Sequence, residues 1–421
     1  MDNGSNTLDF CNLKVVSALG RGAKGLVFLA KINEGQNEKQ WLALKVVSKA
    51  FVRMRNSSHC KRVSFEQQIL RRFNHPLLPQ LRGVLETEEL LGFAIDYCHG
   101  GNLHSLRRKQ SEKTFPVDAI RFYAVELVLV LDYLHSLGVV YRDLKPENIL
   151  IQETGHIMLV DFDLSKKLNP KSPQLLSGIS SPSSDSALLV DRRKRLLPGC
   201  YCCHSGIMPL DSDSQLGTNS PARSESDSVE KSNSFVGTED YVAPEIITGE
   251  GHNFGVDWWS LGVVLYEMLY GMTPFKGVNR KETFQRILMK QPDLSGENTP
   301  LRDLIKKLLE KHPDRRIEVH EIKCHDFFKG VNWNSVLQIA RPPYIPQNDV
   351  EDKAGFSRKD VESFVRKIFF KNDNKEEKPK EVEKKKINGA NQNKVYNKNQ
   401  NTVWVDKLTD NPTQNEDFLM F

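Results

Sequence analysis

The stretch at residues 141–148, which reads YRDLKPEN and is followed by DFD at 161–163, constrains this chain more than any other feature. Asp143 can orient an attacking hydroxyl, and Lys145 can steady a phosphoryl group. Phosphoryl transfer needs little covalent chemistry and much positioning and charge neutralisation. Hard oxygen ligands, which suit Mg²⁺ bound to nucleotide phosphates, come from Asn148 and Asp161. The segment therefore predicts a phosphoryl-transfer site with Asp143 and Lys145 as catalytic residues.

A glycine-rich run, GRGAKGLV at residues 20–27, predicts a hairpin that covers the phosphates. The backbone can approach a phosphate closely where no side chain intervenes, as at Gly20, Gly22 and Gly25. A helix after these glycines would favour a dinucleotide-binding turn instead. The residues that follow, 26–29, are strand formers, so the hairpin is the favoured interpretation.

A lysine in a strand-like run and a glutamate on a helix form the expected charge pair of this site. Lys45 lies in the run ALKVV, where a cation is costly to bury unless phosphate and a carboxylate pair with it. Glu66 lies between Phe65 and Ile69, whose helical spacing leaves Glu66 to face the cleft. We predict that Lys45 pairs with Glu66 beside the nucleotide.

Together these motifs resemble the signature of protein kinases. Two departures are Tyr141 for the usual histidine and Asp163 for the usual glycine. The combination of Asp163 with a long insert resembles the pattern of plant group VIII members of the A/G/C protein kinase group. The resemblance implies an α+β bilobal fold, with a β-rich small lobe at 13–98 and an α-rich large lobe at 99–329. It also implies an N-terminal extension at 1–12, a tail at 330–421, and ATP and Mg²⁺ as cofactors.

Further site residues follow from the same resemblance. Backbone groups of Asp96 and Cys98 are expected to bind the adenine, with walls from Leu19, Val27, Ala43, Ile95 and Leu150. Asp257 is expected to support the catalytic loop, and Arg316 to pair with Glu245. Ser234 is the expected activation-loop phosphosite, and Arg142 the cation that pairs with its phosphate.

The protein substrate is expected to carry a serine or threonine acceptor, because DLKPEN is the serine/threonine form of the loop. Thr238 is expected to contact Asp143. Glu147 and Glu267 resemble carboxylates that read a basic residue near the acceptor. Asn102 stands where strongly basophilic relatives carry another glutamate, so we predict a weaker demand for arginine three residues before the acceptor.

About eighty residues separate DFD from the APE motif at 243–245, and we expect disorder from about 166 to 230. The basic cluster at 192–195 is consistent with a nuclear import signal, a contact with an anionic membrane, or a solvated charge run. Cysteines at 200, 202 and 203 with His204 lie too close together to close a zinc site easily. Thiol oxidation, acylation and no special role stay open for them.

The C-terminal part also resembles this group. Residues 341–346 look like a tail that runs back over the small lobe, and the Lys, Glu and Asn content of residues 348–402 predicts a flexible tether. The chain ends in an F-x-x-F motif, Phe418 and Phe421. These rings are expected to dock on the small lobe or on an upstream phosphoinositide-dependent kinase, with a frayed terminus as the alternative.

Composition agrees with an intracellular enzyme. The net charge of +5 gives no strong case for nucleic acid, and the N-terminus lacks the features of a leader. No apolar run is long enough to span a membrane, and seven cysteines without framework spacing agree with a reducing compartment. We expect a monomer in the cytoplasm, with the nucleus or membrane periphery as alternatives.

The resemblance implies a serine/threonine protein kinase in plant stress or defence signalling, activated by the upstream kinase. The alternative from another class is a catalytically silent scaffold with a kinase fold, which the intact Lys45, Asp143, Asn148 and Asp161 disfavour. A small-molecule kinase is a weaker alternative, because it would lack the peptide-binding segment at 234–245.

Overall fold

The computed structural model describes residues 7–22, 25–32, 40–54, 58–168, 232, 234–339, 342–346, 355–370 and 419–420. The chain divides into one unit of residues 1–169 with 230–421 and a second unit of residues 170–229. The second unit lies outside the described residues, and with it the predicted basic cluster and the crowded cysteines. Phe418 and Phe421 lie outside them as well.

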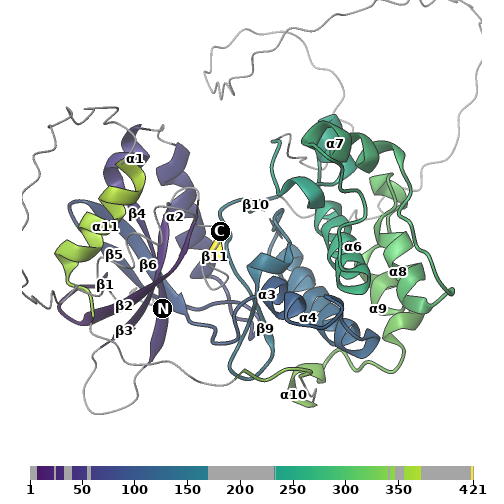
Figure 1. Ribbon diagram of the computed structural model, residues 1–421, viewed down its shortest axis with the longest axis horizontal. Coiled ribbons are helices and arrows are strands. Elements are labelled where there is room, and N and C mark those ends of the chain that lie inside the picture. The colour runs from purple at the N-terminus through teal and green to yellow at the C-terminus, as the bar shows by residue number, and fades with distance from the viewer. Residues whose placement is uncertain are drawn as a thin grey trace, which may run out of the picture. The chain divides into compact units, whose positions relative to one another are not determined.

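Residues 7–96 of this unit form most of a mixed sheet (Figure 1). Its strand order is β1-β5-β6-β4-β3-β2-β11 within the described residues. The bounds are β1 Thr7–Leu8, β2 Leu13–Arg21, β3 Leu26–Ile32, β4 Trp41–Ser48, β5 Leu81–Glu86, β6 Leu90–Asp96 and β11 Leu419–Met420. Strand β1 pairs in parallel with β5, so the sheet begins inside the predicted N-terminal extension at 1–12.

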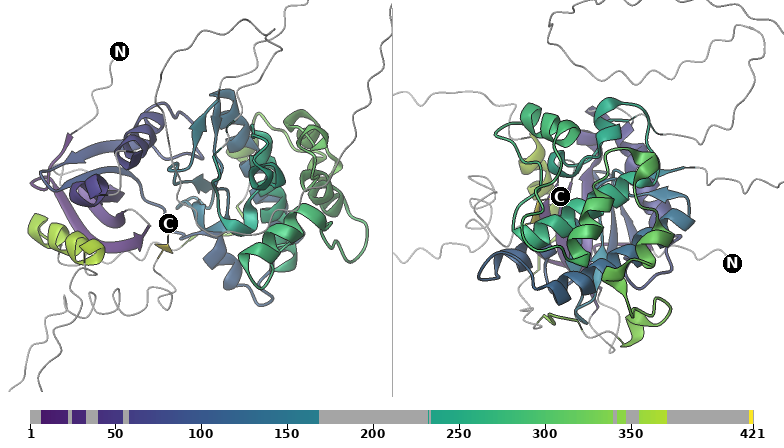
Figure 2. Two further views of the ribbon diagram at one scale, coloured as in Figure 1. Left: turned by 90° about the horizontal axis from the view of Figure 1, so that it is seen from above. Right: turned by 90° about the vertical axis from the view of Figure 1, so that its right-hand side faces the viewer.

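Helices cover both faces of the sheet because its strands are apolar on both sides. Helices α1 (Lys49–Met54) and α2 (Ser58–Leu70) follow β4, and Val52 and Val63 from these helices pack against Val47 on one face. Helix α11 (Arg358–Phe370) lies against the other face, where its Val361 and Val365 are buried among strand residues. Both views of the sheet show α11 beside the strands (Figures 1 and 2).

Helix α11 corrects the prediction of a flexible tether over residues 348–402. Its apolar residues recur at helical spacing, so one face is buried although the segment as a whole is polar. Ser357 caps the helix, because its hydroxyl accepts from the Asp360 N–H at 3.3 Å while its own backbone N–H donates to the Asp360 carboxylate at 2.9 Å.

The rest of the unit is mainly helical, and it carries the larger hydrophobic core. Its helices are α3 Leu103–Arg108, α4 Val117–Ser136, α5 Pro244–Thr248, α6 Gly255–Tyr270, α7 Arg280–Met289, α8 Pro300–Leu308, α9 Val319–Lys323 and α10 Val336–Ile339. Short 3-10 helices lie at Pro146–Asn148, Glu239–Tyr241, Pro313–Arg315 and Asp326–Phe328. The expected β-rich and α-rich parts are therefore both present.

Two small sheets place the candidate site between these helices and the large sheet. Strand β8 (Ile149–Ile151) pairs with β9 (Ile157–Leu159), and β7 (Val139–Val140) pairs with β10 (Lys166–Lys167). Because β10 is an ordered strand, the expected disorder from about residue 166 begins too early. The ladder holds the chain against β7 until at least residue 167.

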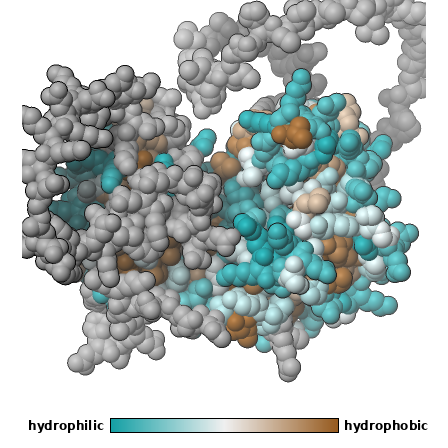
Figure 3. Space-filling view, viewed as in Figure 1, coloured by the Kyte–Doolittle hydropathy of each residue, from teal (hydrophilic) through white to brown (hydrophobic). Residues whose placement is uncertain are grey.

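The described surface of the helical part is mostly hydrophilic on the face seen in Figure 3, with separate hydrophobic patches. Among the described residues, no helix is both long enough and apolar enough to cross a membrane.

Candidate active site

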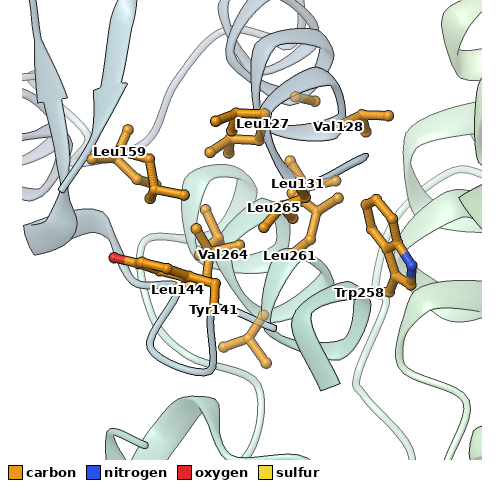
Figure 4. Packing of buried hydrophobic residues seen from close by; sticks show 14 of the residues in the cluster. Leu127, Val128, Leu131, Tyr141, Leu144, Leu159, Trp258, Leu261, Val264 and Leu265 are labelled. Carbon is orange, nitrogen blue, oxygen red and sulfur yellow. The ribbon is translucent and has the colours of Figure 1, made fainter. Parts of the chain in front are cut away.

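The YRDLKPEN loop packs against the hydrophobic core between α4 and α6. Tyr141 and Leu144 are fully buried, and Figure 4 shows both among leucine and valine side chains of these helices. Asp257 of α6 accepts hydrogen bonds from the N–H groups of Tyr141 and Arg142, at 2.9 and 2.7 Å. The predicted support of the loop by Asp257 is therefore present. His135 also contacts this carboxylate, at 2.8 Å.

The Asp143 carboxylate is held at the mouth of this loop by three side chains. The Thr238 hydroxyl donates to Oδ1 at 2.7 Å, as the sequence predicted. Lys145 Nζ and Asn148 Nδ2 lie 2.9 and 3.0 Å from Oδ2. Lys145 also donates to Thr238, at 3.0 Å. The carboxylate therefore has a fixed orientation toward the space where an acceptor hydroxyl would lie.

A second charge cluster joins the sheet to the DFD segment. Lys45 Nζ lies 3.0 Å from both Glu66 carboxylate oxygens and 2.8 Å from Asp161 Oδ1. Burial lowers the pKa of Lys45, but Asp161 and Glu66 oppose this and raise the pKa above its usual value. Lys45 therefore stays protonated and can hold a phosphate. The backbone N–H of Phe162 donates to Glu66 at 3.2 Å, which ties α2 to the same segment.

The predicted adenine-binding residues line one apolar pocket. Among its lining residues are Leu19, Val27, Ala43, Lys45, Glu66, Ile95, Asp96, Cys98, Leu150 and Asp161. The Asp96 side chain accepts from Arg82 Nε at 2.6 Å and from the Gln80 N–H at 2.9 Å. Because the Asp96 side chain is occupied by these two groups, the adenine contact predicted for Asp96 would be made by its backbone.

A second pocket continues from the first toward the catalytic loop, and the two share Val27, Lys45 and Asp161. Its lining also includes Gly22, Gly25, Asp143, Lys145 and Thr238. A Cβ at Gly25 would lie 2.6 Å from the Val46 carbonyl oxygen, so glycine is required for this close approach. Gly20 lines neither pocket and pairs with Val27 in the sheet.

The predicted metal ligands have the chemistry that a hard cation needs. The Asn148 Oδ1 atom is buried and has no hydrogen-bond partner among the described residues. The Asn148 carbonyl accepts from the Val160 N–H at 3.1 Å, which brings Asn148 beside the residue before Asp161. A buried amide oxygen without a donor is a candidate ligand for Mg²⁺.

Arg142 forms the expected cationic centre near the activation-loop serine. Its Nη1 atom lies 2.8 Å from Ser234 Oγ and 3.1 Å from Ser232 Oγ, and its Nε donates to the Leu164 carbonyl at 2.7 Å. His252 Nε2 lies 3.4 Å from the same Nη1. No short motif links Ser232 and His252 to Arg142, so neither residue was predicted from the sequence.

The residues predicted to read the substrate have partners of their own. Glu267 is buried and accepts from Arg107 Nη2 at 2.7 Å, so a substrate cation would have to compete with Arg107. Glu147 Oε1 lies 3.2 Å from His104 Nδ1. Asn102 caps α3 by accepting from the Ser105 N–H at 2.8 Å, a role that the sequence analysis missed.

The APE motif is anchored by the predicted ion pair. Arg316 donates to both oxygens of Glu245, at 2.7 and 3.0 Å, and the two side chains are 1% and 2% exposed. Phe162 of DFD is fully buried and packs against Tyr141 and Phe73, with ring centroids 5.3 and 4.8 Å apart. Both contacts fix segments that border the pocket.

Comparison with known proteins places this geometry in a family context. The family model described as "Protein kinase domain" matches residues 13–183 and 219–328. Serine/threonine-protein kinase OXI1 of Arabidopsis thaliana is 52% identical over 428 residues, covering 99% of this chain and 98% of that protein. From the same organism, serine/threonine-protein kinase UCN is 40% identical, covering 83% and 88%. Serine/threonine-protein kinase AGC1-5 is 43% identical, covering 80% and 59%.

Proposed function

The chain belongs to the protein kinase family, and within it to the plant A/G/C serine/threonine kinases; from this we propose how it transfers the γ-phosphoryl group of ATP to serine and threonine. The observation that carries the proposal is the contact of Lys45 with both Glu66 and Asp161, at 3.0 and 2.8 Å. A cation held by two carboxylates beside a pocket is ready to bind phosphate.

Asp143 accepts a hydrogen bond from the acceptor hydroxyl and orients its oxygen toward the phosphoryl group. Its contacts with Thr238 and Asn148 hold the carboxylate in place before substrate binds. Lys145, which lies 2.9 Å from Asp143, steadies the transferred group and balances charge at the acceptor. Most of the rate enhancement therefore comes from groups already in position.

ATP binds with its adenine in the apolar pocket and its phosphates beneath the glycine-rich turn. Asn148 and Asp161 would hold Mg²⁺, and the bound ion would supply positive charge that offsets the charge of the phosphates. The buried Asn148 oxygen without a described partner supports this assignment. Lys45 binds the phosphates directly, and Glu66 keeps its ammonium group oriented.

Activation follows phosphorylation of Ser234 by an upstream phosphoinositide-dependent kinase. The exposed Ser234 hydroxyl lies 2.8 Å from Arg142 Nη1, so a phosphate there would meet a cation next to catalytic Asp143. Phe418 and Phe421 dock on the upstream kinase or on the small lobe, as the sequence pattern suggests. Ser234→Ala and Phe421→Ala should each abolish stimulation by that kinase without abolishing basal transfer.

We assign the pathway to plant stress or defence signalling on the resemblance to group VIII A/G/C kinases. The protein acts as a monomer in the cytoplasm, and the basic cluster at 192–195 directs any nuclear or membrane-peripheral pool. Sedimentation of the full chain, and imaging with the cluster changed to alanine, test these two assignments.

Transfer of labelled γ-phosphate to peptides with serine, threonine or tyrosine acceptors tests the proposed chemistry. Wild type should label serine and threonine peptides, and Asp143→Asn should lose transfer while it still binds ATP. Labelling of tyrosine alone would contradict the acceptor class. No transfer by wild type under any condition, with the folded protein still binding nucleotide, would favour the scaffold alternative.

A further inference from the structure

An exposed arginine lies over two aromatic rings beside the activation-loop serine. The Arg280 guanidinium carbon Cζ is 5.3 Å from the ring centroid of Phe235 and 5.0 Å from that of Phe284. The two ring centroids are themselves 5.7 Å apart. Phe235 follows Ser234 directly in the chain, and Phe284 belongs to α7, which is labelled in Figure 1. These three side chains, here called the Arg280 platform, therefore join α7 to the activation segment.

We propose that the Arg280 platform binds an acidic side chain of the protein substrate, a few residues from the acceptor hydroxyl. Arg280 is then a specificity-determining residue, because its guanidinium donates hydrogen bonds to the substrate carboxylate. The inference rests on the proposed function, since it takes the substrate to be a protein. It is opposite in sign to the role expected for Glu147 and Glu267, which are anionic and would bind a basic residue.

Arg280 keeps its charge available for an anion from outside the chain. Within the described part of the chain, no residue forms an ion pair or a hydrogen bond with the Arg280 side chain. The nearest acid of the same helix turn, Glu282, accepts from Arg286 Nη2 at 2.6 Å and from the Val278 N–H at 3.0 Å. Because these two donors occupy Glu282, that carboxylate does not neutralise Arg280.

The place of Arg280 in the helix shows that it is not there to stabilise α7. Asn279 caps the helix by accepting from the Glu282 N–H at 3.0 Å, so Arg280 is the first helical residue and Lys281 the second. The helix dipole carries partial positive charge at this end, where cations are destabilising and acidic residues are favoured. A residue that breaks a local preference without a stabilising contact of its own is expected at functional sites.

The aromatic rings hold the guanidinium in place without using its hydrogen bonds. Phe235 is 49% exposed, so its ring serves the surface and not the core. A guanidinium is attracted to the face of an aromatic ring, and its N–H groups stay free to form a bidentate contact with a carboxylate. A side chain that is already held in position loses less conformational entropy when a ligand binds. The Arg280 platform is therefore prepared to bind an acid.

The Arg280 platform lies within reach of a peptide bound at Asp143. Thr238 donates to the Asp143 carboxylate at 2.7 Å and is three residues after Phe235. Three residues span at most about 10 Å of chain. Helix α7 also packs beside the 3-10 helix at Glu239–Tyr241, which continues from Thr238. An acidic residue within about five positions of the acceptor can therefore reach Arg280.

Phosphorylation of serine peptides by the full chain tests this inference. Glu or Gln is placed in turn at each of the five positions on either side of the acceptor. Wild type should favour Glu over Gln at one or more positions by roughly two- to fivefold in kcat/KM, the range expected for an exposed ion pair. The difference should lie in the KM for peptide and should shrink as salt is raised, because salt screens exposed charges.

Variants of the Arg280 platform separate recognition from structure. Arg280→Gln should remove the preference for Glu, and Arg280→Glu should reverse it, so that a peptide with Lys at the same position becomes the better substrate. Lys290→Gln, which changes an exposed cation at the other end of α7, is the matched control and should keep the wild-type preference. Phe235→Leu should weaken the preference because the ring is lost, and Phe235→Tyr should retain it.

Absence of a preference for Glu at every position in wild type would overturn the inference, and so would a preference that persists in Arg280→Gln. An equal loss of rate on Glu and Gln peptides in Arg280→Gln would also overturn it, since that result indicates a structural role. If wild type phosphorylates no peptide, the proposed function fails. Fluorescence anisotropy with labelled Glu and Gln peptides then still decides the inference, because wild type should bind the Glu peptide more tightly and Arg280→Gln should bind both equally.

Discussion

The buried pair of Glu245 and Arg316 gives the most quantitative prediction for the stability of the helical part. The two side chains are 2% and 1% exposed and make two bonds of 2.7 and 3.0 Å. Arg316 also donates to the Gly255 carbonyl at 2.9 Å. Arg316→Ala would leave a buried carboxylate without its cation, which costs about 3–5 kcal/mol. For a domain of this size we expect Tm to fall by about 5–9 °C.

Thermal unfolding followed by circular dichroism measures this loss, together with a double-mutant cycle. Glu245→Gln should also destabilise, because Arg316 then keeps a buried charge without a counterion. The apolar double variant Glu245→Leu/Arg316→Met should lose less than Arg316→Ala, since neither charge remains. A loss below about 1 kcal/mol for Arg316→Ala would refute the reasoning, and so would a Glu245→Gln/Arg316→Ala variant whose loss equals the sum of the losses of its two single variants.

Three further predictions concern the catalytic loop and its surroundings. Burial, and to a lesser extent the positive charge of Arg142, lowers the pKa of His252 in the folded chain from 6.5 to about 4. Between these pH values the unfolded chain therefore binds a proton that the folded chain does not. Stability should therefore fall as pH falls from 6.5 toward 4, and urea denaturation should show less of this fall in His252→Gln. Asp257→Ala removes the acceptor for two loop N–H groups and should lower the free energy of unfolding by about 2–4 kcal/mol. It should lower kcat strongly and change the KM for ATP less, which steady-state kinetics will measure. Asn148→Ala should raise the Mg²⁺ concentration needed for half-maximal rate at fixed ATP, and an unchanged Mg²⁺ titration would contradict its role as a ligand.

The parts of the site that the sequence predicts best are those in which one short motif carries both the chemistry and the geometry. YRDLKPEN places Asp143, Lys145 and Asn148 within one loop, so their contacts follow once the loop is recognised. The partnership of Lys45 with Glu66 needs only a strand and a helix in the expected order. In each case the residue types allow few other satisfied arrangements for buried charges.

Helix α11 was not predicted, because the composition of residues 348–402 as a whole is polar and hides the short apolar pattern of the helix. Its signal is local: Ser357 and Asp360 match a capping pattern directly before apolar residues at helical spacing. A window of about one helix length would have found it. The start of the insert was misplaced for a similar reason, because the polar residues of β10 owe their order to pairing with β7.

Other features depend on contacts between distant segments and have no local signal. Ser232 and His252 are brought together near Arg142 by two backbone hydrogen bonds, because the N–H of each donates to the carbonyl of the other at 3.0 Å. The pairing of β11 with β2 joins opposite ends of the sequence. Tertiary structure, not residue pattern, determines these roles.

The most direct test of the central claim is the initial rate of γ-phosphate transfer by wild type and Asp161→Asn, purified side by side. Asp314→Asn, a change at an exposed aspartate outside the site, serves as the matched control. The contacts of Asp161 with Lys45 and its place in both pockets predict a loss of at least about a hundredfold, with Asp314→Asn unchanged. Equal rates for wild type and Asp161→Asn would show that these residues do not carry the transfer.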